Sequence, residues 1–203
     1  MEAAGIVLAG GKSTRMGRNK ALLPLGQETM IGRVVGLLKL IFPEIIIVTN
    51  EPELYRDLQV TLVRDVIPAQ GPLSGIHAGL LASPYWYNFV VACDMPFINL
   101  ELITFMVKEA QGFDGAVPRL GGFYQPLHAV YGRSCIEPIE ACLKRKLTQV
   151  IAFYPEVRLR VLDADDLERF GDLETVFFNI NTPGDLEQAR SKVGKEGGGG
   201  AAS

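Results

Sequence analysis

The stretch of residues 6–20, IVLAGGKSTRMGRNK, constrains the fold and the chemistry of this chain more than any other stretch. Ile6, Val7 and Leu8 form a short apolar run that is typical of a strand covered on both faces of a parallel sheet. Gly10 and Gly11 end this run. Without Cβ atoms they allow positive φ and a close approach of backbone N–H groups to a ligand. Four cations follow within nine residues, namely Lys12, Arg15, Arg18 and Lys20. The pattern predicts a turn that binds a polyanion such as a triphosphate.

The spacing of this turn differs from the two commonest phosphate-binding motifs. A Walker A loop requires a glycine five places before the Gly-Lys-Ser of residues 11–13, and that place holds Ile6. A dinucleotide fingerprint requires Gly-x-Gly-x-x-Gly, but the next glycine after Gly11 is Gly17. Solvated cations on an ordinary strand-to-loop turn are the alternative, although such a turn does not require so many cations. The sequence therefore indicates a phosphate-binding turn of another class.

Length, charge and cysteine content limit the class of protein. With 203 residues, 48% of them hydrophobic, the chain can bury one substantial core, and we expect a single domain over residues 1–193. The net charge of −3 provides no general basic field, so no nucleic-acid partner is expected. The three cysteines are odd in number and lack C-x-x-C spacing. This argues against a disulfide framework or a zinc site and favours the reducing cytoplasm.

Neither a membrane segment nor a further domain is expected. No uninterrupted apolar run approaches the roughly 18 residues of a membrane span, so no membrane partner is predicted. From Gly194 the composition changes to GKEGGGGAAS. This segment has nothing to pack, and we expect a flexible glycine-rich tail over residues 194–203.

Strand-like and helix-like segments alternate over the first half of the chain. Strands are expected near residues 4–9, 45–49, 60–64 and 88–93, and helices near 29–41, 52–58, 73–82 and 99–110. This order predicts an α/β fold, a single Rossmann-like three-layer domain with a mostly parallel, mixed sheet between helices. Beyond residue 110 we expect a hairpin turn at Gly121 and Gly122, a strand over 123–131, and a closing helix over 182–191. Thr182 would be the N-cap of that helix and Pro183 its first residue.

Asp94 is the strongest chemical candidate. It follows the apolar run of residues 89–93, and Pro96 prevents the chain from continuing as a central strand. A carboxylate placed opposite a phosphate-binding turn is a suitable ligand for Mg²⁺, which proteins hold with one or two carboxylates and the substrate phosphates. An aspartate that only stabilises a turn is the alternative.

Asn50 and Asp65 follow two other predicted strands, so we expect them to meet Gly10 and Asp94 at the carboxyl edge of the sheet. Guanine presents adjacent N1–H and N2–H donors, and a carboxylate can accept both, which makes Asp65 a candidate for base recognition. The alternative for Asp65 is a solvated acid at the end of a strand, and the alternative for Asn50 is a simple turn residue. Residues 71–75, GPLSG, lead into a predicted helix whose first N–H groups could bind an anion or the base edge. An ordinary loop before a helix is the alternative for these residues. His77 and His128 are expected to be structural.

Six segments carry a family resemblance: LAGGKSTRMGRNKALLPL (8–25), RD (64–65), GPLSGIHAGL (71–80), CDMPF (93–97), QPLHAVY (125–131) and NINTPGDL (179–186). In this order they resemble the nucleotidyltransferases of the molybdenum cofactor guanylyltransferase type. The resemblance extends along nearly the whole chain. It implies a sheet of the nucleotide-diphospho-sugar transferase type, with Mg²⁺ as cofactor.

The resemblance also implies an activity and the residues that carry it. The activity is transfer of GMP from GTP to the phosphate of molybdopterin carrying molybdenum, with release of pyrophosphate. Its catalytic residues would be Arg15, Lys20 and Asp94. The metal would be held by Asp94 with Asn181 or Asn179, unless these asparagines only cap the helix that follows. The nucleotide-binding residues would be Leu8, Ala9, Gly10, Gly11, Lys20, Asn50, Asp65, Gly75 and Asp94.

Other activities remain open. Related turns occur in cytidylyltransferases for the same cofactor and in sugar-1-phosphate nucleotidyltransferases, because a fold fixes a reaction class better than its substrates. A nucleotide-binding adaptor for cofactor insertion is the non-enzymatic alternative, and molybdoenzymes or their chaperones are candidate partners. A groove for the pterin is expected on the C-terminal half, near Arg119, Gln125 and Pro126.

Overall fold

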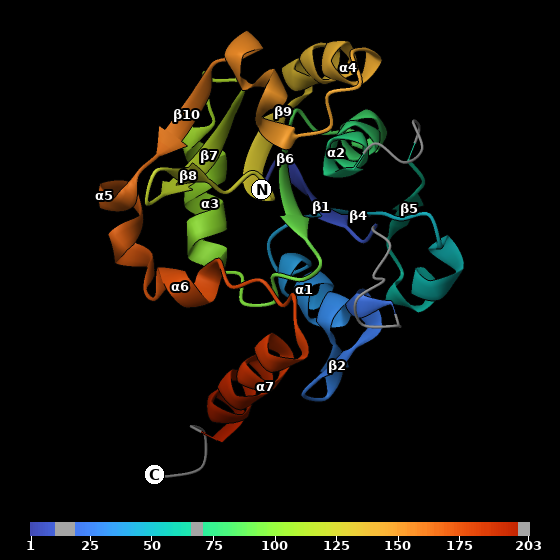
Figure 1. The fold of residues 1–203 in the computed structure, drawn as a ribbon, viewed down its shortest axis with the longest axis vertical. Coiled ribbons are helices and arrows are strands. Elements are labelled where there is room, and N and C mark those ends of the chain that lie inside the picture. Colours follow the sequence, from blue (N-terminus) through green and yellow to red (C-terminus); the bar gives the residue numbers. More distant parts are fainter. Residues whose placement is uncertain (11–18, 66–70, 199–203) are drawn as a thin grey trace.

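A mixed β-sheet with helices on both faces forms the centre of the computed structural model, which describes residues 1–10, 19–65 and 71–198 (Figure 1). The strand order is β10-β7-β9-β6-β1-β4-β5, and β8 pairs with β7. The strands are β1 (Ala3–Leu8), β4 (Glu44–Val48), β5 (Thr61–Val63), β6 (Tyr87–Ala92), β7 (Gly115–Leu120), β8 (Phe123–Tyr124), β9 (His128–Gly132) and β10 (Leu159–Leu162). A separate hairpin pairs β2 (Pro24–Leu25) with β3 (Glu28–Thr29).

Strand direction brings four carboxyl ends to one edge. β1 pairs in parallel with β4 and β6, and β4 pairs in parallel with β5. In this register Leu8 lies between Val48 and Ala92. β9 runs antiparallel to both β6 and β7, so the sheet is mixed. The expected fold class is confirmed, and so is the shared edge on which the candidate residues depend.

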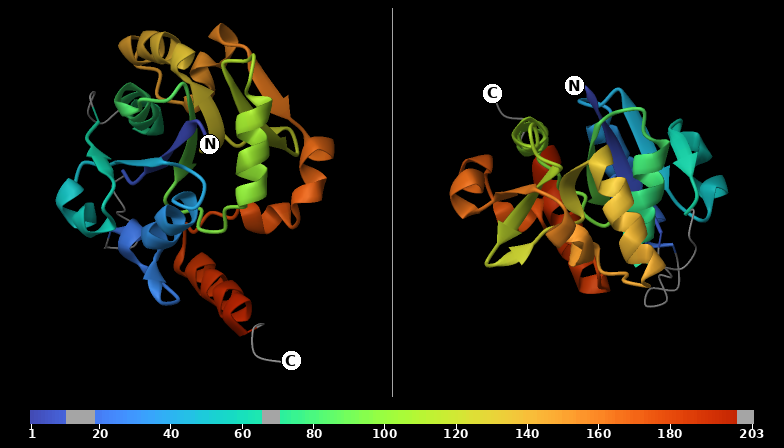
Figure 2. Two further views of the ribbon diagram at one scale, coloured as in Figure 1. Left: turned by 180° about the vertical axis from the view of Figure 1, so that it is seen from behind. Right: turned by 90° about the horizontal axis from the view of Figure 1, so that it is seen from above.

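Alternation along the strands divides the core between the two faces. In β1, Val7 packs in the cluster that includes α1 (Met30–Leu38) and α3 (Leu100–Glu109). Ile6 and Leu8 pack in the opposite cluster, with α2 (Gly71–Ala82) and α4 (Ile136–Lys144). Figure 2 shows these helices on the two sides of the sheet. A strand that is buried on both faces needs apolar residues at successive positions, which explains the unbroken apolar run.

The C-terminal helix α7 (Pro183–Gly198) packs beside the β2–β3 hairpin (Figure 1). Leu186 and Ala189 join Leu25 and Met30 in a third apolar cluster. The Thr182 hydroxyl accepts a hydrogen bond from the N–H of Asp185 at 3.1 Å, and the Asp185 carboxylate accepts one from the N–H of Thr182 at 2.7 Å. This reciprocal cap confirms the predicted start of the helix.

Several expectations differ from the structure. The helix expected over 52–58 is a 3₁₀ helix (Pro52–Leu58), and the strand expected over 123–131 is divided into β8 and β9. α7 continues to Gly198, whereas the tail was expected to begin at Gly194. The sequence did not predict β7, β10, α4, α5 (Ala164–Leu167) or α6 (Leu173–Val176). The remaining 3₁₀ turns are Lys20–Leu22, Arg133–Cys135, Val150–Glu156 and Glu168–Phe170. No helix in the described ranges has the length and apolar character needed to span a membrane.

Candidate active site

The glycine turn leaves β1 between two parallel neighbours. The N–H of Ala9 donates to the carbonyl of Val48 at 2.9 Å, and the N–H of Cys93 donates to the carbonyl of Leu8 at 3.1 Å. The strand pairing therefore continues to the residue before Gly10. Apart from its chain neighbours, no heavy atom of the described residues lies within 4 Å of the position that a Cβ of Gly10 would occupy. Gly11 and Arg15, with the neighbouring cations, lie outside the described residues.

Lys20 lies at the centre of the described part of the edge. Its ammonium donates to Oδ2 of Asp94 at 2.9 Å and to Oδ1 of Asn181 at 3.0 Å. The side chains of Lys20 and Asp94 are only 15% and 23% exposed, so their attraction is weakly screened by water. Three distant segments of the sequence therefore meet at one ammonium group.

Asp94 has one carboxylate oxygen available for a group from outside the chain. Oδ2 accepts from Lys20, whereas the buried Oδ1 has no hydrogen-bond partner in the described structure. A buried carboxylate oxygen without a partner costs free energy, and such an atom is a natural metal ligand. Within the described residues, no group of three or more His, Cys, Asp or Glu side chains is placed to hold a metal ion. A hard cation at Asp94 would therefore need amide, phosphate or water oxygens as well.

The two candidate asparagines near the C-terminus do not share one position. Asn181 reaches Lys20, but the amide of Asn179 donates to the carbonyl of Phe177 at 3.2 Å. Residues 178–181 form no strand, so the spacing of the two asparagines does not place their side chains on one face. The N–H of Ile180 donates to the carbonyl of Asp94 at 3.0 Å, and this contact holds the segment against the site.

Asn50 and Asp65 form the other part of the edge. The Asn50 amide donates to Oδ2 of Asp65 at 3.4 Å. Burial raises the pKa of Asp65 above its ordinary value, and the hydrogen bond from Asn50 opposes this shift. A Cβ on Gly75 would lie 3.7 Å from Oδ1 of Asp65 and 3.2 Å from Cδ2 of Leu8. The glycine therefore keeps space free beside a partly buried carboxylate.

Sequence reasoning missed one polar residue of the site, Asn19. Its side chain caps the 3₁₀ turn that begins at Lys20, accepting from the N–H of Ala21 at 3.1 Å. An asparagine directly before a helical turn is a known capping signal. That signal was present in the sequence, but the turn itself was not predicted.

The two histidines lie in packing contacts, as expected. Nε2 of His77 on α2 lies 3.0 Å from Oε1 of Glu140 on α4. His128 is fully buried, with the rings of Phe89 and Phe177 at centroid distances of 5.0 and 4.8 Å. Burial lowers the pKa of His128 to about 3.

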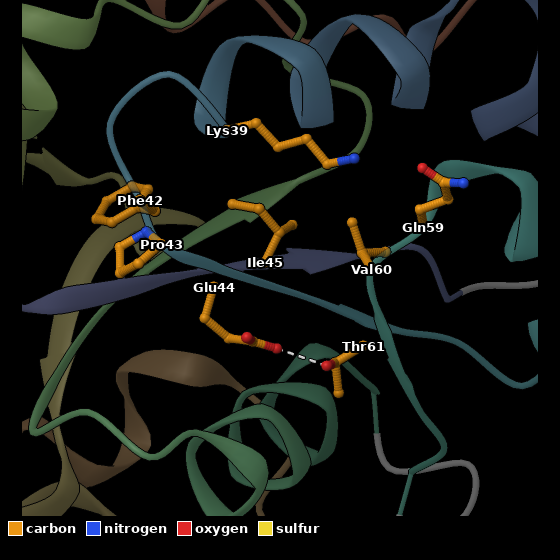
Figure 3. A pocket seen from close by; sticks show the side chains of 8 residues that line it. All are labelled: Lys39, Phe42, Pro43, Glu44, Ile45, Gln59, Val60 and Thr61. Atoms are coloured by element: carbon orange, nitrogen blue, oxygen red, sulfur yellow. Dashed lines mark hydrogen bonds between the residues drawn. The ribbon is translucent and has the colours of Figure 1, made fainter.

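A hollow of about 300 Å³ lies at the opposite edge of the sheet, where β4 and β5 begin (Figure 3). Three polar side chains that line it, Lys39, Glu44 and Thr61, already make hydrogen bonds within the protein. Lys39 donates to the carbonyl of Leu58 at 2.7 Å, and the Thr61 hydroxyl donates to Glu44. None of the predicted site residues lines it. The lining residues are Lys39, Phe42, Pro43, Glu44, Ile45, Gln59, Val60 and Thr61.

A mixed α/β sheet whose carboxyl edge brings Gly10, a lysine and a half-buried aspartate together is an arrangement suited to nucleotidyl transfer. The comparisons agree with this class. The chain belongs to the family of MobA-like NTP transferase domains, whose model matches residues 5–159.

Individual relatives cover almost the whole chain. A probable molybdenum cofactor guanylyltransferase from Pelotomaculum thermopropionicum is 48% identical over 190 residues, which are 94% of this chain and 93% of the relative. The crystal structure of molybdopterin-guanine dinucleotide biosynthesis protein A from Archaeoglobus fulgidus is similar with a TM-score of 0.83 and 25% identity, covering 95% of this chain and 99% of that one. The 2-C-methyl-D-erythritol 4-phosphate cytidylyltransferase from Thermus thermophilus has a TM-score of 0.69 at 15% identity, covering 93% and 97%. This last likeness concerns the fold alone.

Proposed function

We propose that the chain transfers GMP from GTP to the terminal phosphate of molybdopterin carrying molybdenum, giving the guanine dinucleotide form of the cofactor and pyrophosphate. One observation carries the proposal. In a chain 48% identical to a relative named as such a guanylyltransferase, Lys20 meets Asp94 at 2.9 Å at the edge where β1 ends. A cation and a half-buried carboxylate are groups that can stabilise the charge of nucleotidyl transfer.

In the proposed reaction a phosphate oxygen of the acceptor attacks the α-phosphorus of GTP in line. A new P–O bond forms as the bond to the β-phosphate oxygen breaks, and pyrophosphate leaves. No covalent intermediate on the protein is needed. The work of the protein is to position the two substrates and to neutralise their charge.

Each candidate residue has a part in this scheme. Lys20 and Arg15 neutralise phosphate oxygens, and Lys20 exchanges its contact with Asp94 for a phosphate contact when the nucleotide binds. The N–H groups of Gly10 and Gly11 donate to other phosphate oxygens. Lys20 can move between these partners because its ammonium rotates on a flexible stem.

We propose Mg²⁺ as the cofactor, with Asp94 as its protein ligand. The unpartnered Oδ1 of Asp94 fits this role, and the amide oxygen of Asn181 is the nearest additional candidate. When bound, the ion would neutralise phosphate charge. Asn179, whose amide donates to the carbonyl of Phe177, is the weaker candidate.

Guanine selection follows from Asp65. Burial already disfavours its charged form, so the carboxylate gains most from a base that presents two adjacent N–H donors. Guanine presents such a pair at N1 and N2. Cytosine offers only its amino group beside an acceptor nitrogen, and adenine has no equivalent pair. Asn50 holds the carboxylate, and Gly75 leaves room for the base edge. This argument favours GTP over CTP.

The acceptor is proposed to bind on the side of β7 and β8. The carbonyl of Leu127 accepts from the N–H of Ala92 at 3.1 Å, so the segment that carries Gln125 and Pro126 reaches the same edge as Asp94. Arg119 lies on β7, where Asp163 holds its guanidinium at 2.7 and 2.9 Å. These groups would face an anionic pterin.

We further propose that the reaction takes place in the cytoplasm and that molybdoenzymes or their chaperones receive the product. The three cysteines, Cys93, Cys135 and Cys142, are free in the structure, which supports a reducing compartment. Residues 1–193 would be the working domain.

The test is pyrophosphate release by the purified chain with Mg²⁺, the molybdenum cofactor and each of GTP, CTP, ATP and UTP. Release that depends on GTP and on the cofactor supports the proposal. Release with CTP instead would identify a cytidylyltransferase, and release with a sugar 1-phosphate as acceptor would identify a sugar nucleotidyltransferase. Binding of GTP without release would favour the adaptor.

A further inference from the structure

We infer that Asn19 is a positioning residue that fixes the backbone turn from which the Lys20 side chain reaches Asp94, because its side chain ties this turn to the segment that follows β4. The inference rests on the proposed role of Lys20. Three hydrogen bonds of one side chain carry it, and they involve both ends of the amide.

The oxygen end fixes the turn. Oδ1 of Asn19 accepts from the N–H of Ala21 at 3.1 Å, while the backbone carbonyl of Asn19 accepts from the N–H of Leu22 at 3.1 Å. Ala21 is buried, so the turn cannot rotate without exposing it. Lys20 lies between Asn19 and Ala21, so these contacts fix its backbone.

The nitrogen end fixes the turn to the rest of the protein. Nδ2 of Asn19 donates to the Tyr55 hydroxyl at 2.9 Å and to Oε2 of Glu51 at 3.2 Å. Tyr55 is only 1% exposed, and burial raises the pKa of its phenol, so the hydroxyl keeps its proton. The N–H of Glu51 donates to the hydroxyl of Thr49 at 3.1 Å, which fixes Glu51 at the end of β4.

Only an amide satisfies all three contacts in this orientation. The turn needs an acceptor, whereas the Glu51 carboxylate needs a donor. An aspartate at position 19 would keep the cap but would set two carboxylates against each other. This polarity allows a swap experiment, since Asn19→Asp combined with Glu51→Gln exchanges the amide and the carboxylate across one hydrogen bond.

The kinetic experiment compares kcat and KM for GTP in Asn19→Ala, Asn19→Asp, Glu51→Gln and the double variant. We expect kcat of Asn19→Ala and Asn19→Asp to fall about 10- to 100-fold, with KM for GTP changed less than about threefold, because a displaced charge costs transition-state stabilisation. Glu51→Gln alone should stay within about threefold of wild type, since its amide oxygen can still accept. The double variant should recover most of the loss of Asn19→Asp.

Asn99→Ala is the matched control. Asn99 caps α3 by accepting from the N–H of Leu102 at 2.9 Å, and its amide donates to the carbonyl of Phe170 at 2.9 Å. The control therefore loses the same kinds of hydrogen bond in another part of the fold. It should lower stability by a similar amount and leave kcat unchanged.

A second readout does not depend on activity. In protein labelled with ¹³C at lysine Cε, the Lys20 signal is the one lost in Lys20→Arg. It should move toward the positions of exposed lysines in Asn19→Ala and stay unchanged in Asn99→Ala. Should the wild-type protein release no pyrophosphate, the proposed function would fail and this measurement would still decide the role of Asn19. An unmoved Lys20 signal, a wild-type kcat in Asn19→Ala, or no recovery in the double variant would overturn the inference.

Discussion

Asp94 is the residue on which the chemistry of the site converges. Its Oδ2 is paired with Lys20 at 2.9 Å, and its buried Oδ1 has no hydrogen-bond partner among the described residues, so one carboxylate oxygen is held and the other is available. A group in this state binds an additional cation more readily than a fully paired one. Lys20 supplies the compensating charge for this carboxylate in the structure.

The first prediction follows from this pairing. Lys20→Ala and Asp94→Ala should each lower the rate of pyrophosphate release by roughly 10²–10³ or more, because each removes a charge that stabilises the transition state. Circular dichroism should show both variants folded. Lys39→Ala, at the opposite edge where Lys39 donates to the carbonyl of Leu58, is the control and should keep wild-type activity. Wild-type turnover in either site variant would contradict the assignment.

The second prediction concerns the base. Asp65→Asn preserves size but replaces a double acceptor with a group that offers one acceptor and one donor, so the preference for GTP over CTP and ATP should fall about tenfold or more. A nucleotide competition assay measures this preference. Because the pKa of Asp65 is raised, GTP affinity of the wild type should weaken on acidification at a higher pH than an ordinary aspartate would give. Unchanged selectivity in the variant would remove Asp65 from this role.

Site residues could be predicted from the sequence where a strand end fixes them. Asp65 and Asp94 are candidates because each follows an apolar run, and parallel pairing brings such strand ends to one edge. Lys20 is a candidate because it follows the two glycines after the first strand. Asn181 could not be distinguished from Asn179, because the segment that carries them is held by a single backbone contact with Asp94 rather than by a strand. That contact depends on tertiary structure.

At the scale of elements, α2 shows how packing and site are linked. Two glycines on this helix face β1, but they meet it differently. A Cβ on Gly79 would lie 2.6 Å from Cγ2 of the buried Ile6, whereas a Cβ on Gly75 would meet the end of the Leu8 side chain at 3.2 Å. The first position requires glycine for packing, and the second leaves room beside Asp65.

The third prediction compares these two positions. Gly79→Ala should reduce the free energy of unfolding by about 1–3 kcal/mol, because the added methyl overpacks against β1. Gly75→Ala should change it by less than about 1 kcal/mol, since the better helix propensity of alanine offsets a mild crowding. The same Gly75→Ala should weaken GTP binding. Denaturant titration and a GTP binding assay measure both quantities, and a Gly75→Ala variant with wild-type affinity would place the base elsewhere.

Elements were predictable where burial on both faces gives continuous apolar runs, as in β1, β4 and β6. β7 was not predicted because Pro118 interrupts its apolar pattern. A proline has no N–H to donate, but its carbonyl still accepts, and here the Pro118 carbonyl accepts from the N–H of Gln125 at 2.8 Å. Pro126, which has no N–H to donate, separates β8 from β9. The 3₁₀ helix Pro52–Leu58 has a helical composition, and periodicity alone does not distinguish the two kinds of helix.

At the scale of the whole molecule, the C-terminal third completes the site and the core together. Asn181 comes back to Lys20 across 161 positions of the sequence. Phe177, a few residues earlier, closes the core over His128 on β9. The position of the segment that carries Asn181 therefore depends on the packing of Phe177 against the buried His128.

His128 links the stability of the whole fold to pH. Neither ring nitrogen has a partner among the described residues, and burial alone lowers its pKa from 6.5 to about 3. The folded state holds this imidazole neutral, whereas the unfolded chain protonates it below about pH 6.5. The corresponding stability is therefore fully present above pH 6.5 and is lost as the pH falls toward 3.

The fourth prediction is that His128→Leu flattens this dependence. Through His128 the wild type should lose about 2 kcal/mol of unfolding free energy between pH 7 and pH 5, a range in which aspartates with lowered pKa values stay ionised. The variant should not show that loss, and at pH 7 it should remain close to wild type, because removing two unpartnered polar atoms offsets the lost ring contacts. Urea titrations at both pH values measure the difference. The chain has one other histidine, so His77→Gln is the control for loss of a histidine outside this core contact. A wild-type slope that persists in His128→Leu would show that the acid sensitivity of the fold does not come from the buried imidazole beneath Phe177.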